Sequence, residues 1–295
     1  MDFKRIQVLL LIFFVIFDVF LAYLLVDKGA FGLNLKDPTA KINAIQEMKD
    51  RGVQISSNLT IDDKQPELAI LKTAPTNELW ANRKQLKNQN LTISPEGILV
   101  SEFTNPINLD ISLGENIYSL TNEDFAWIRE NVLMDEELFI HGDKYLNHWY
   151  SPQERLLIIR MVTKQGTMSD DSNTAQPIPI SDGTGEIRIL FNDNYDMVSY
   201  VQTYQPEMVH LQDRKPLISS NQALEIIENR IDTTLPNDAE IISVNQGYYQ
   251  SVRTKEFNLY VPVWEVIYYR RENGQSLSVL VDAMKGNVVN NKGVN

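Results

Sequence analysis

The apolar residues are spread unevenly along the chain. One continuous apolar run covers residues 6–26, and the remainder alternates between short apolar and polar segments. Helix-start patterns occur at residues 37–38, 121–124 and 219–222. Each places a capping residue ahead of apolar positions three or four apart, which is typical of an amphipathic helix. Gly52 fits the end of the first of these helices.

Short segments rich in β-branched and aromatic residues fill most of the space between these helices. They lie near residues 53–61, 68–73, 97–103, 137–149, 154–163, 186–192, 197–204, 240–250, 257–270, 276–282 and 286–290. Each predicted helix is thus followed by several short strands with turn residues between them. This order predicts an α+β fold in which helices cover one face of antiparallel β-sheets.

The same pattern suggests how the chain is divided. We expect a tail at residues 1–5, a transmembrane helix at 6–26, a linker at 27–36, an N-terminal lobe at 37–118 and a C-terminal lobe at 119–295. The last lobe is either one unit or two units of helix plus meander that meet near residue 211. A weak likeness between the hairpins at 191–198 and 281–288 favours two units.

The apolar run is long enough to cross a bilayer. Its 21 residues would rise ~31 Å as a helix, which is about the thickness of the hydrocarbon layer. A cleaved signal peptide is the alternative, but its apolar region would be shorter, roughly 7–15 residues. The first small pair after the run, Gly29 and Ala30, also has Lys28 beside it. We therefore expect an uncleaved anchor in the cell membrane.

The orientation of this anchor depends on the flanking cations. Lys4 and Arg5 directly precede the helix and favour a cytoplasmic N-terminus. Lys28, Lys36 and Lys41 follow the helix closely, so the count of lysines and arginines alone does not decide. If Lys4 and Arg5 determine the orientation, the protein crosses the membrane once and the bulk of the chain is extracytoplasmic.

Asp18 lies near the middle of the predicted membrane helix. A carboxylate at that depth costs ~2.5–3.5 kcal/mol on insertion scales. Its helical neighbours are Phe14, Val15, Leu21 and Ala22, and the small Ala22 would let another helix approach closely. One interpretation is therefore a helix–helix contact in which Asp18 finds a hydrogen-bond donor. The other is a tolerated, protonated acid with local thinning of the bilayer.

Composition restricts the chemistry of the remaining segment. The net charge is −12, and all of the excess lies in residues 27–295, which argues against binding of nucleic acid. The chain has no cysteine, so a disulfide, a thiol nucleophile and a cysteine-ligated metal are excluded. His141 and His148 are seven residues apart and would point to opposite faces of a strand, and His210 is remote in sequence. We therefore predict no metal site.

Sequence motifs for catalysis are missing as well. The chain has no G-x-S-x-G, Walker A, H-E-x-x-H or G-x-G-x-x-G pattern. Its 39 acidic residues offer no pattern that singles out a catalytic pair. We predict no catalytic residues, no cofactor and no enzymatic activity.

Aromatic doublets are the remaining candidates for a functional surface. They are Trp149 with Tyr150, Tyr248 with Tyr249, and Tyr268 with Tyr269. In a strand, each doublet places one ring on each face, so that one ring is core and the other can be half exposed. Trp149, Tyr248, Tyr249, Tyr268 and Tyr269 are therefore candidates for an exterior interface. Ordinary sheet packing is the alternative.

Several of these features together resemble a known family. The opening Met1-Asp-Phe-Lys-Arg-Ile6, followed by an apolar run that contains an aspartate, is similar to the start of YycI (WalI) proteins. Near the C-terminus, the tyrosine pair at 248–249, the run Val261-Pro-Val-Trp264 and a closing hairpin at 281–288 also resemble that family. Phe3 departs from the tryptophan expected there, and residues 75–118 resemble nothing that we can align.

The resemblance implies a regulator of the WalK/YycG two-component system, which controls cell-wall homeostasis in low-GC Gram-positive bacteria. It implies a similar single-pass partner, YycH, with which the protein would form a heterodimer and act on the sensor histidine kinase, partly through transmembrane helices. It also implies lobes of helix-backed antiparallel sheet, as in YycH and PepSY-like units.

Two other classes of function stay open. A membrane-tethered cell-wall enzyme predicts a concave pocket that holds two carboxylates with perturbed pKa values. An extracytoplasmic sensor for peptides or wall fragments predicts a binding cleft or an exposed sheet edge.

Overall fold

The computed structural model describes Phe14, Phe17 and residues 44–109, 111, 113–114, 119–163, 177–230 and 234–289. Residues 43–295 form one compact unit, and residues 1–42 belong to another. Phe14 and Phe17 are helical and exposed, and the rest of the predicted membrane helix and linker lies outside the described residues. Among the residues that are described, no helix is long and apolar enough to cross a membrane.

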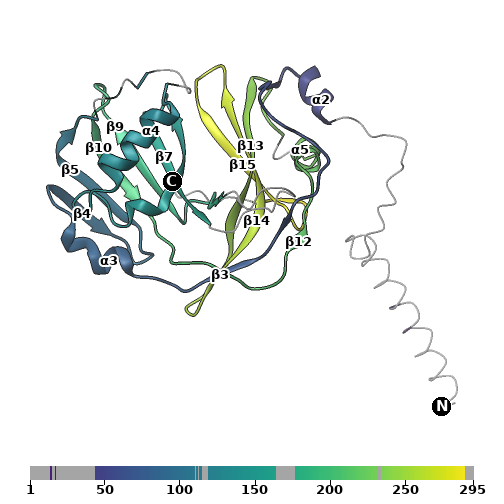
Figure 1. Cartoon of the computed structure of the whole chain (residues 1–295). Coiled ribbons are helices and arrows are strands. Elements are labelled where there is room, and N and C mark those ends of the chain that lie inside the picture. The colour runs from purple at the N-terminus through teal and green to yellow at the C-terminus, as the bar shows by residue number, and fades with distance from the viewer. Residues whose placement is uncertain are drawn as a thin grey trace, which may run out of the picture. The chain divides into compact units, whose positions relative to one another are not determined.

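The C-terminal sheet is built around two long antiparallel strands and has seven strands (Figure 1). Its order is β1-β13-β14-β15-β16, with β3 paired to β14 and β11 paired to β3. The bounds are β1 Gln54–Ile55, β3 Leu71–Thr73, β11 Val209–His210, β13 Ala239–Arg253, β14 Asn258–Arg270, β15 Ser276–Asp282 and β16 Asn287–Val289. Only the β1–β13 pair within this sheet is parallel.

The central sheet also has seven strands, and every pair in it is antiparallel. Its order is β4-β5-β10-β9-β7-β6, with β8 paired to β7. The bounds are β4 Gln89–Ile93, β5 Leu99–Ile107, β6 Tyr145–Ser151, β7 Leu156–Thr163, β8 Ile178–Pro179, β9 Glu186–Phe191 and β10 Met197–Gln202. A separate two-stranded sheet pairs β2 (Glu67–Leu68) with β12 (Lys215–Pro216).

Two of the predicted helix starts form complete capping boxes. Thr121 caps α4 (Asn122–Ile128) and Ser219 caps α5 (Ser220–Glu228), each through reciprocal bonds with the third helical residue. The helix α2 (Ala44–Asp50) is followed by Gly52, whose φ of +102° suits glycine at the end of a helix. The helices predicted to start at 121–124 and 219–222 are thus confirmed, and α2 confirms the later part of the first helix, whose predicted start at residues 37–38 lies outside the described residues.

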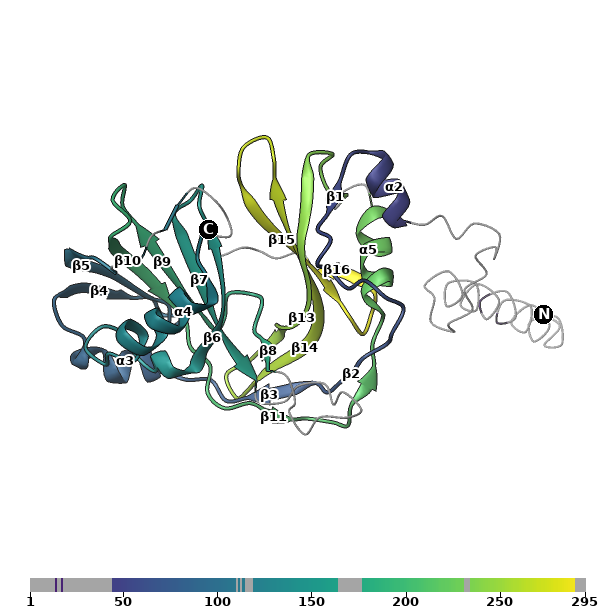
Figure 2. The ribbon, with the colours of Figure 1, turned by 45° about the horizontal axis from the view of Figure 1, so that its top comes forward.

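The remaining helical elements are short. They are α3 (Glu78–Asn82), the 3₁₀ turns η1 (Arg83–Gln85) and η3 (Gly142–Lys144), and the π-helical turn η2 (Arg129–Leu133) that extends α4. Helices α2 and α5 lie together beside the C-terminal sheet, and α3 and α4 lie beside the central sheet (Figures 1 and 2). The mixed α+β class is therefore as predicted, with few helices and two main sheets.

Strand pairing divides the chain differently from the predicted boundary at residue 118. Residues 37–118 were expected to form one lobe, yet β1 and β3 join the C-terminal sheet whereas β4 and β5 join the central sheet. Strands β6 to β10 precede residue 211 and join the central sheet, whereas β13 to β16 follow it and join the C-terminal sheet. The reason is that β5 pairs with its neighbour β4 on one side and with β10, about a hundred residues later, on the other.

The two-residue period of the strands places alternate side chains on the two faces of each sheet. On β9, Ile187, Ile189 and Phe191 are buried in the main core, and Glu186, Arg188 and Leu190 occupy the opposite face. On β14, the residues on one face include Trp264, whose Nε1 donates to Ile218 O just before α5 at 2.8 Å. The opposite face of β14 carries Glu265, which is only 2% exposed.

His148 of β6 makes the stability of the folded protein depend on pH. Its ring stacks on Phe125 of α4 at 3.9 Å, and burial lowers its pKa from 6.5 to about 4. In the unfolded chain this histidine binds a proton more readily than in the folded protein. Its contribution to the free energy of unfolding is therefore fully present above pH ~6.5 and is lost as the pH falls toward ~4. Allowing for solvent screening of a partly exposed ring, we expect this histidine to contribute ~1–3 kcal/mol of that decline.

The substitution His148→Phe keeps the stacked ring and removes the titration. We define the acid loss as the decrease in the free energy of unfolding between about pH 7.5 and about pH 4.5. Measured by urea unfolding, it should be smaller for this variant than for the wild type. His210→Phe, at an exposed position, is the matched control and should leave the acid loss as it is. Equal acid losses in wild type and His148→Phe would contradict this role of His148.

Candidate functional site

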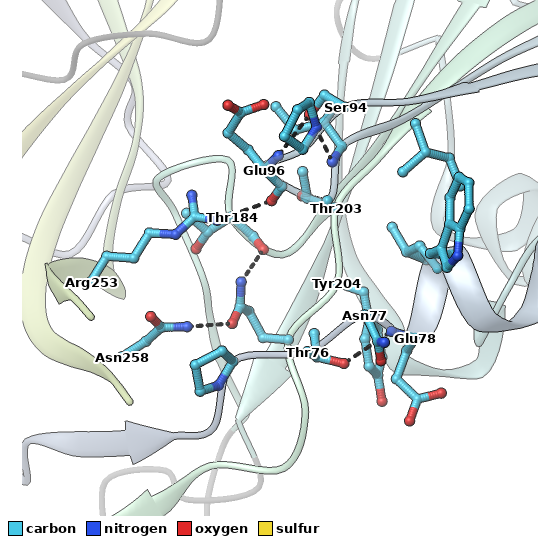
Figure 3. Close-up of a pocket in the computed structure, with 18 of the residues that line it drawn as sticks. Thr76, Asn77, Glu78, Ser94, Glu96, Thr184, Thr203, Tyr204, Arg253 and Asn258 are labelled. Atoms are coloured by element: carbon cyan, nitrogen blue, oxygen red, sulfur yellow. Dashed lines mark hydrogen bonds between the residues drawn. The ribbon is translucent and has the colours of Figure 1, made fainter. Parts of the chain in front are cut away.

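A cleft of about 630 Å³ opens between the central sheet and the C-terminal sheet (Figure 3). Five stretches of chain meet there: the start of α3, the β4–β5 turn, the loop before β9, the loop after β10, and the β13–β14 hairpin. The polar residues that line it are Thr76, Asn77, Glu78, Ser94, Glu96, Thr184, Thr203, Tyr204, Gln205, Gln250, Arg253 and Asn258.

The β4–β5 turn presents one carboxylate to this cleft. Ser94 Oγ accepts from the backbone N–H groups of Glu96 at 3.2 Å and Ile98 at 3.4 Å, and Gly97 adopts a φ of +83° that closes the turn. A hydrogen bond from Ser94 holds the pKa of Glu96 below its ordinary value, so this group is ionised near neutral pH. The turn therefore fixes a negative charge at the rim.

Arg253 reaches the same rim from the C-terminal sheet. Its Nη2 donates to the backbone carbonyl of Glu96 at 3.0 Å. Glu78, at the start of α3, is the third charged residue of the lining, and its carboxylate lies 3.4 Å from His141 Nε2. The cleft thus carries two carboxylates contributed from the side of the central sheet and one guanidinium contributed from the C-terminal sheet.

A chain of side-chain amides and hydroxyls crosses the cleft (Figure 3). Asn258 Nδ2 donates to Gln205 Oε1 at 3.4 Å, and Gln205 Nε2 donates to Thr184 O at 3.0 Å. Thr184 Oγ1 is also hydrogen-bonded to the hydroxyl of Tyr260 at 2.8 Å. Asn258 is 5% exposed, and its Oδ1 has no partner among the described residues. An unpaired buried polar atom of this kind costs ~1–3 kcal/mol.

The back of the cleft is closed by a carboxylate that clamps two segments together. Asp182 accepts from Thr184 N at 3.1 Å and Thr184 Oγ1 at 2.6 Å, and also from Gln250 N on β13. Burial raises the pKa of Asp182, and these hydrogen bonds oppose the rise. Because the donors come from both sides, the clamp holds the loop before β9 against β13.

The loop before β9 can approach β13 closely only because residue 247 is a glycine. Ser181 N donates to Tyr248 O at 2.8 Å, which brings the loop next to Gly247. A Cβ at position 247 would lie 2.3 Å from Ser181 Oγ, closer than real Cβ contacts allow. Gly247 therefore lets the two walls of the cleft meet.

Deeper between the sheets, Arg160 of β7 forms a buried ion pair with Glu265 of β14. Nη1 of Arg160 lies 2.6 Å from Glu265 Oε2, and Ser181 Oγ donates to the same oxygen at 2.8 Å. Glu186 Oε2 lies 3.5 Å from Arg160 Nε, and Arg188 pairs with Glu186 in turn. The group contains two guanidinium groups and two carboxylates, so its charges balance.

The electrostatics of this group favour its ionised form. Burial acts to lower the pKa of Arg160, but Glu265 and Glu186 outweigh it and keep the pKa above its ordinary value. Arg160, Glu186 and Glu265 are 4%, 4% and 2% exposed, so water screens the pair weakly. We call these residues, with Arg188, the inter-sheet ion cluster.

The sequence-predicted site residues do not gather at the cleft. Asp18, Val15, Leu21 and Ala22 lie outside the described residues. Tyr248 and Tyr268 are buried, at 1% and 9% exposed, which corrects their candidacy for an exterior interface. They occupy the core faces of β13 and β14, and Tyr248 donates to Ala69 O at 3.0 Å.

Each aromatic doublet places one ring inside and one at the surface. Tyr249, Tyr269 and Trp149 are half-buried, whereas their neighbours in sequence are buried. Tyr249 donates to Asp282 Oδ2 at 3.1 Å. The alternation predicted for the doublets is therefore confirmed, and a role of these three residues in an interface stays a prediction.

Sequence reasoning missed both the cleft and the ion cluster. The cleft residues come from separate polar turns, and no local motif joins them. The cluster did leave a signal, because Arg160 is the single charge of β7 and Glu265 is flanked on both sides by apolar residues of β14. Such a charge is rarely buried without a partner. In the described ranges, no group of three or more histidines and acids could hold a metal ion.

Comparisons with known proteins identify similar sequences and folds. The YycI protein family model matches residues 36–284. An uncharacterised protein from Eubacterium rectale has a TM-score of 0.41 at 12% identity, covering 80% of this chain and 89% of its own. The C-terminal domain of Bacillus megaterium YpeB has a TM-score of 0.33 at 10% identity, covering 84% and 95%. Curated proteins gave no match.

Removal of one charged partner from the inter-sheet ion cluster should lower the stability of the protein. Glu265→Leu leaves the buried Arg160 with only Glu186, 3.5 Å from its Nε, and we expect a loss of about 3 kcal/mol in the free energy of unfolding. The double variant Arg160→Met/Glu265→Leu removes both charges and should recover most of that loss. Urea unfolding measures both.

The exposed pair Arg155–Asp193 provides the control, since the Asp193 side chain is 86% exposed. Asp193→Asn should change stability by less than about 1 kcal/mol. A loss for Glu265→Leu no larger than that of Asp193→Asn would show that the cluster does not hold the sheets together.

Proposed function

The chain belongs to the YycI family, and on this premise we propose that it is a membrane-anchored, non-enzymatic accessory regulator of the sensor histidine kinase WalK/YycG. The observation that carries the proposal is the family match over residues 36–284, which covers most of the chain. Membership suggests a regulator of the WalK/YycG two-component system. A regulator of this kind needs contact surfaces for its partners and no catalytic constellation.

The finer mechanism that we propose has a membrane part and an exterior part. The apolar run at residues 6–26 anchors the chain, with the N-terminus in the cytoplasm and the bulk outside. The exterior segment pairs with a YycH-like protein, and together they act on the kinase. Tyr249, Tyr269 and Trp149, all half-buried, are the candidate contacts of this segment.

Asp18 supports a contact within the membrane. A carboxylate near the bilayer centre is costly for a helix surrounded by lipid, and a donor on a partner helix offsets part of that cost. Ala22 lies one turn away and permits close approach of the partner on the same face.

The test compares Asp18→Leu and Ala22→Phe with wild type at matched protein level and topology. Asp18→Leu should insert better, because it removes ~3 kcal/mol, and should still weaken association with the kinase. Polar contacts between membrane helices average ~0.6 kcal/mol and reach ~1.7 kcal/mol, so the loss should be about threefold and under about twentyfold. Ala22→Phe should weaken association in the same direction.

Leu10→Phe is the control, since position 10 lies roughly 80° away around the helix. The readouts are in-membrane association and kinase output. Wild-type values for both Asp18→Leu and Ala22→Phe would refute the transmembrane mechanism and leave the exterior aromatic residues as the next candidates.

A further inference from the structure

We propose that the cleft between the two sheets binds a short peptide. The inference goes beyond regulation of the kinase and does not depend on it, because it concerns a ligand of this chain alone. A cavity of about 630 Å³ is in the size range of sites for small ligands. Its walls are also tied to each other before any ligand arrives, through the Asp182 clamp and the Ser181–Tyr248 hydrogen bond.

Four side-chain amides belong to the polar lining. They are Asn77 at the start of α3, Gln205 after β10, and Gln250 and Asn258 of the β13–β14 hairpin. A primary amide carries the same donor and acceptor groups as a peptide unit, so the two can pair through N–H and C=O together. A wall with four amides is therefore complementary to a polypeptide backbone.

One of these amides lacks a partner. Asn258 Oδ1 is buried and accepts no hydrogen bond from the described residues, while the Nδ2 of the same amide is directed to Gln205. This oxygen is closed off from solvent, so a backbone N–H of a bound peptide pairs with it only when the Asn258 amide turns toward the cleft. A carboxylate ligand would instead place a second acceptor beside this oxygen.

The charges of the lining separate a peptide from other polar ligands. Arg253 extends from the β13–β14 hairpin to the β4–β5 turn that carries Glu96, and Glu78 lies at the start of α3 (Figure 3). A short peptide has an α-carboxylate and an α-amino group and can match both signs. A neutral glycan uses neither charge, and a polyanion is repelled by the two carboxylates.

The rim also has an apolar part that could hold a side chain of the peptide. Trp80 is 53% exposed and lies on the lining together with Ile93 and Leu79. The Arg83 guanidinium covers one face of the Trp80 ring at 3.6 Å. This arrangement favours an occupant with both a polar backbone and apolar side chains.

The test is direct binding to the full-length chain in mild detergent, with no kinase present. The probes are an array of tetrapeptides composed of Gly, Ala, Leu, Lys and Glu, each with a free or an amidated C-terminus, and chitotetraose as a glycan. We expect at least one tetrapeptide to bind more tightly than ~1 mM and amidation to weaken it about five- to tenfold. Chitotetraose should not bind.

Two variants locate the site. Arg253→Gln should bind the free and the amidated forms of that peptide equally, because the carboxylate has lost its partner. Asn258→Ser should weaken both forms by a similar factor. Lys255→Gln is the matched control, an exposed cation of the same hairpin that does not line the cleft, and should retain the wild-type preference.

Several outcomes would overturn the proposal. They are the failure of every tetrapeptide to bind more tightly than ~1 mM, binding of chitotetraose alone, or an undiminished effect of amidation in Arg253→Gln. Loss of the preference in Lys255→Gln would likewise overturn it, since attraction by any nearby cation would then explain the result.

Discussion

The ion pair between Arg160 and Glu265 is the constraint on which the arrangement of the two sheets depends. Arg160 is the single charge of β7, and Glu265 lies in the apolar part of β14, so sliding of the sheets would leave the buried Glu265 without its guanidinium partner. Glu265 Oε1 still has no hydrogen-bond partner among the described residues, so the pair is incompletely satisfied. Its main effect is therefore to specify how the sheets face each other, because apolar contacts alone would tolerate several registers.

The cleft follows from that arrangement. With β7 and β14 held together between the sheets, the β13–β14 hairpin reaches the β4–β5 turn, where Arg253 donates to the Glu96 carbonyl. Ser181 links the two features physically, since its hydroxyl donates to Glu265 and its amide donates to Tyr248 at the back of the cleft. A site built in this way is preformed, and preformed sites lose less entropy when a ligand binds.

Local features of this fold could be predicted from the sequence, and long-range ones could not. The capping boxes at Thr121 and Ser219 are complete within four residues, so the helices they start were found correctly. The pairing of β5 with β10 depends on contacts about a hundred residues apart, and the expected lobe at 37–118 did not allow for it. Strand β4 and helix α3 are short and polar, which hid them and the cleft residues that they position.

Regulation of a membrane kinase remains the central functional claim, and it rests on family membership together with the proposed anchor. The most direct measurement is co-purification of the full-length chain from mild detergent, with expression of the chain, WalK/YycG and the YycH-like protein confirmed beforehand. The account predicts that the kinase or the YycH-like protein is recovered with the chain. Repeated recovery of the chain without either of them would contradict it.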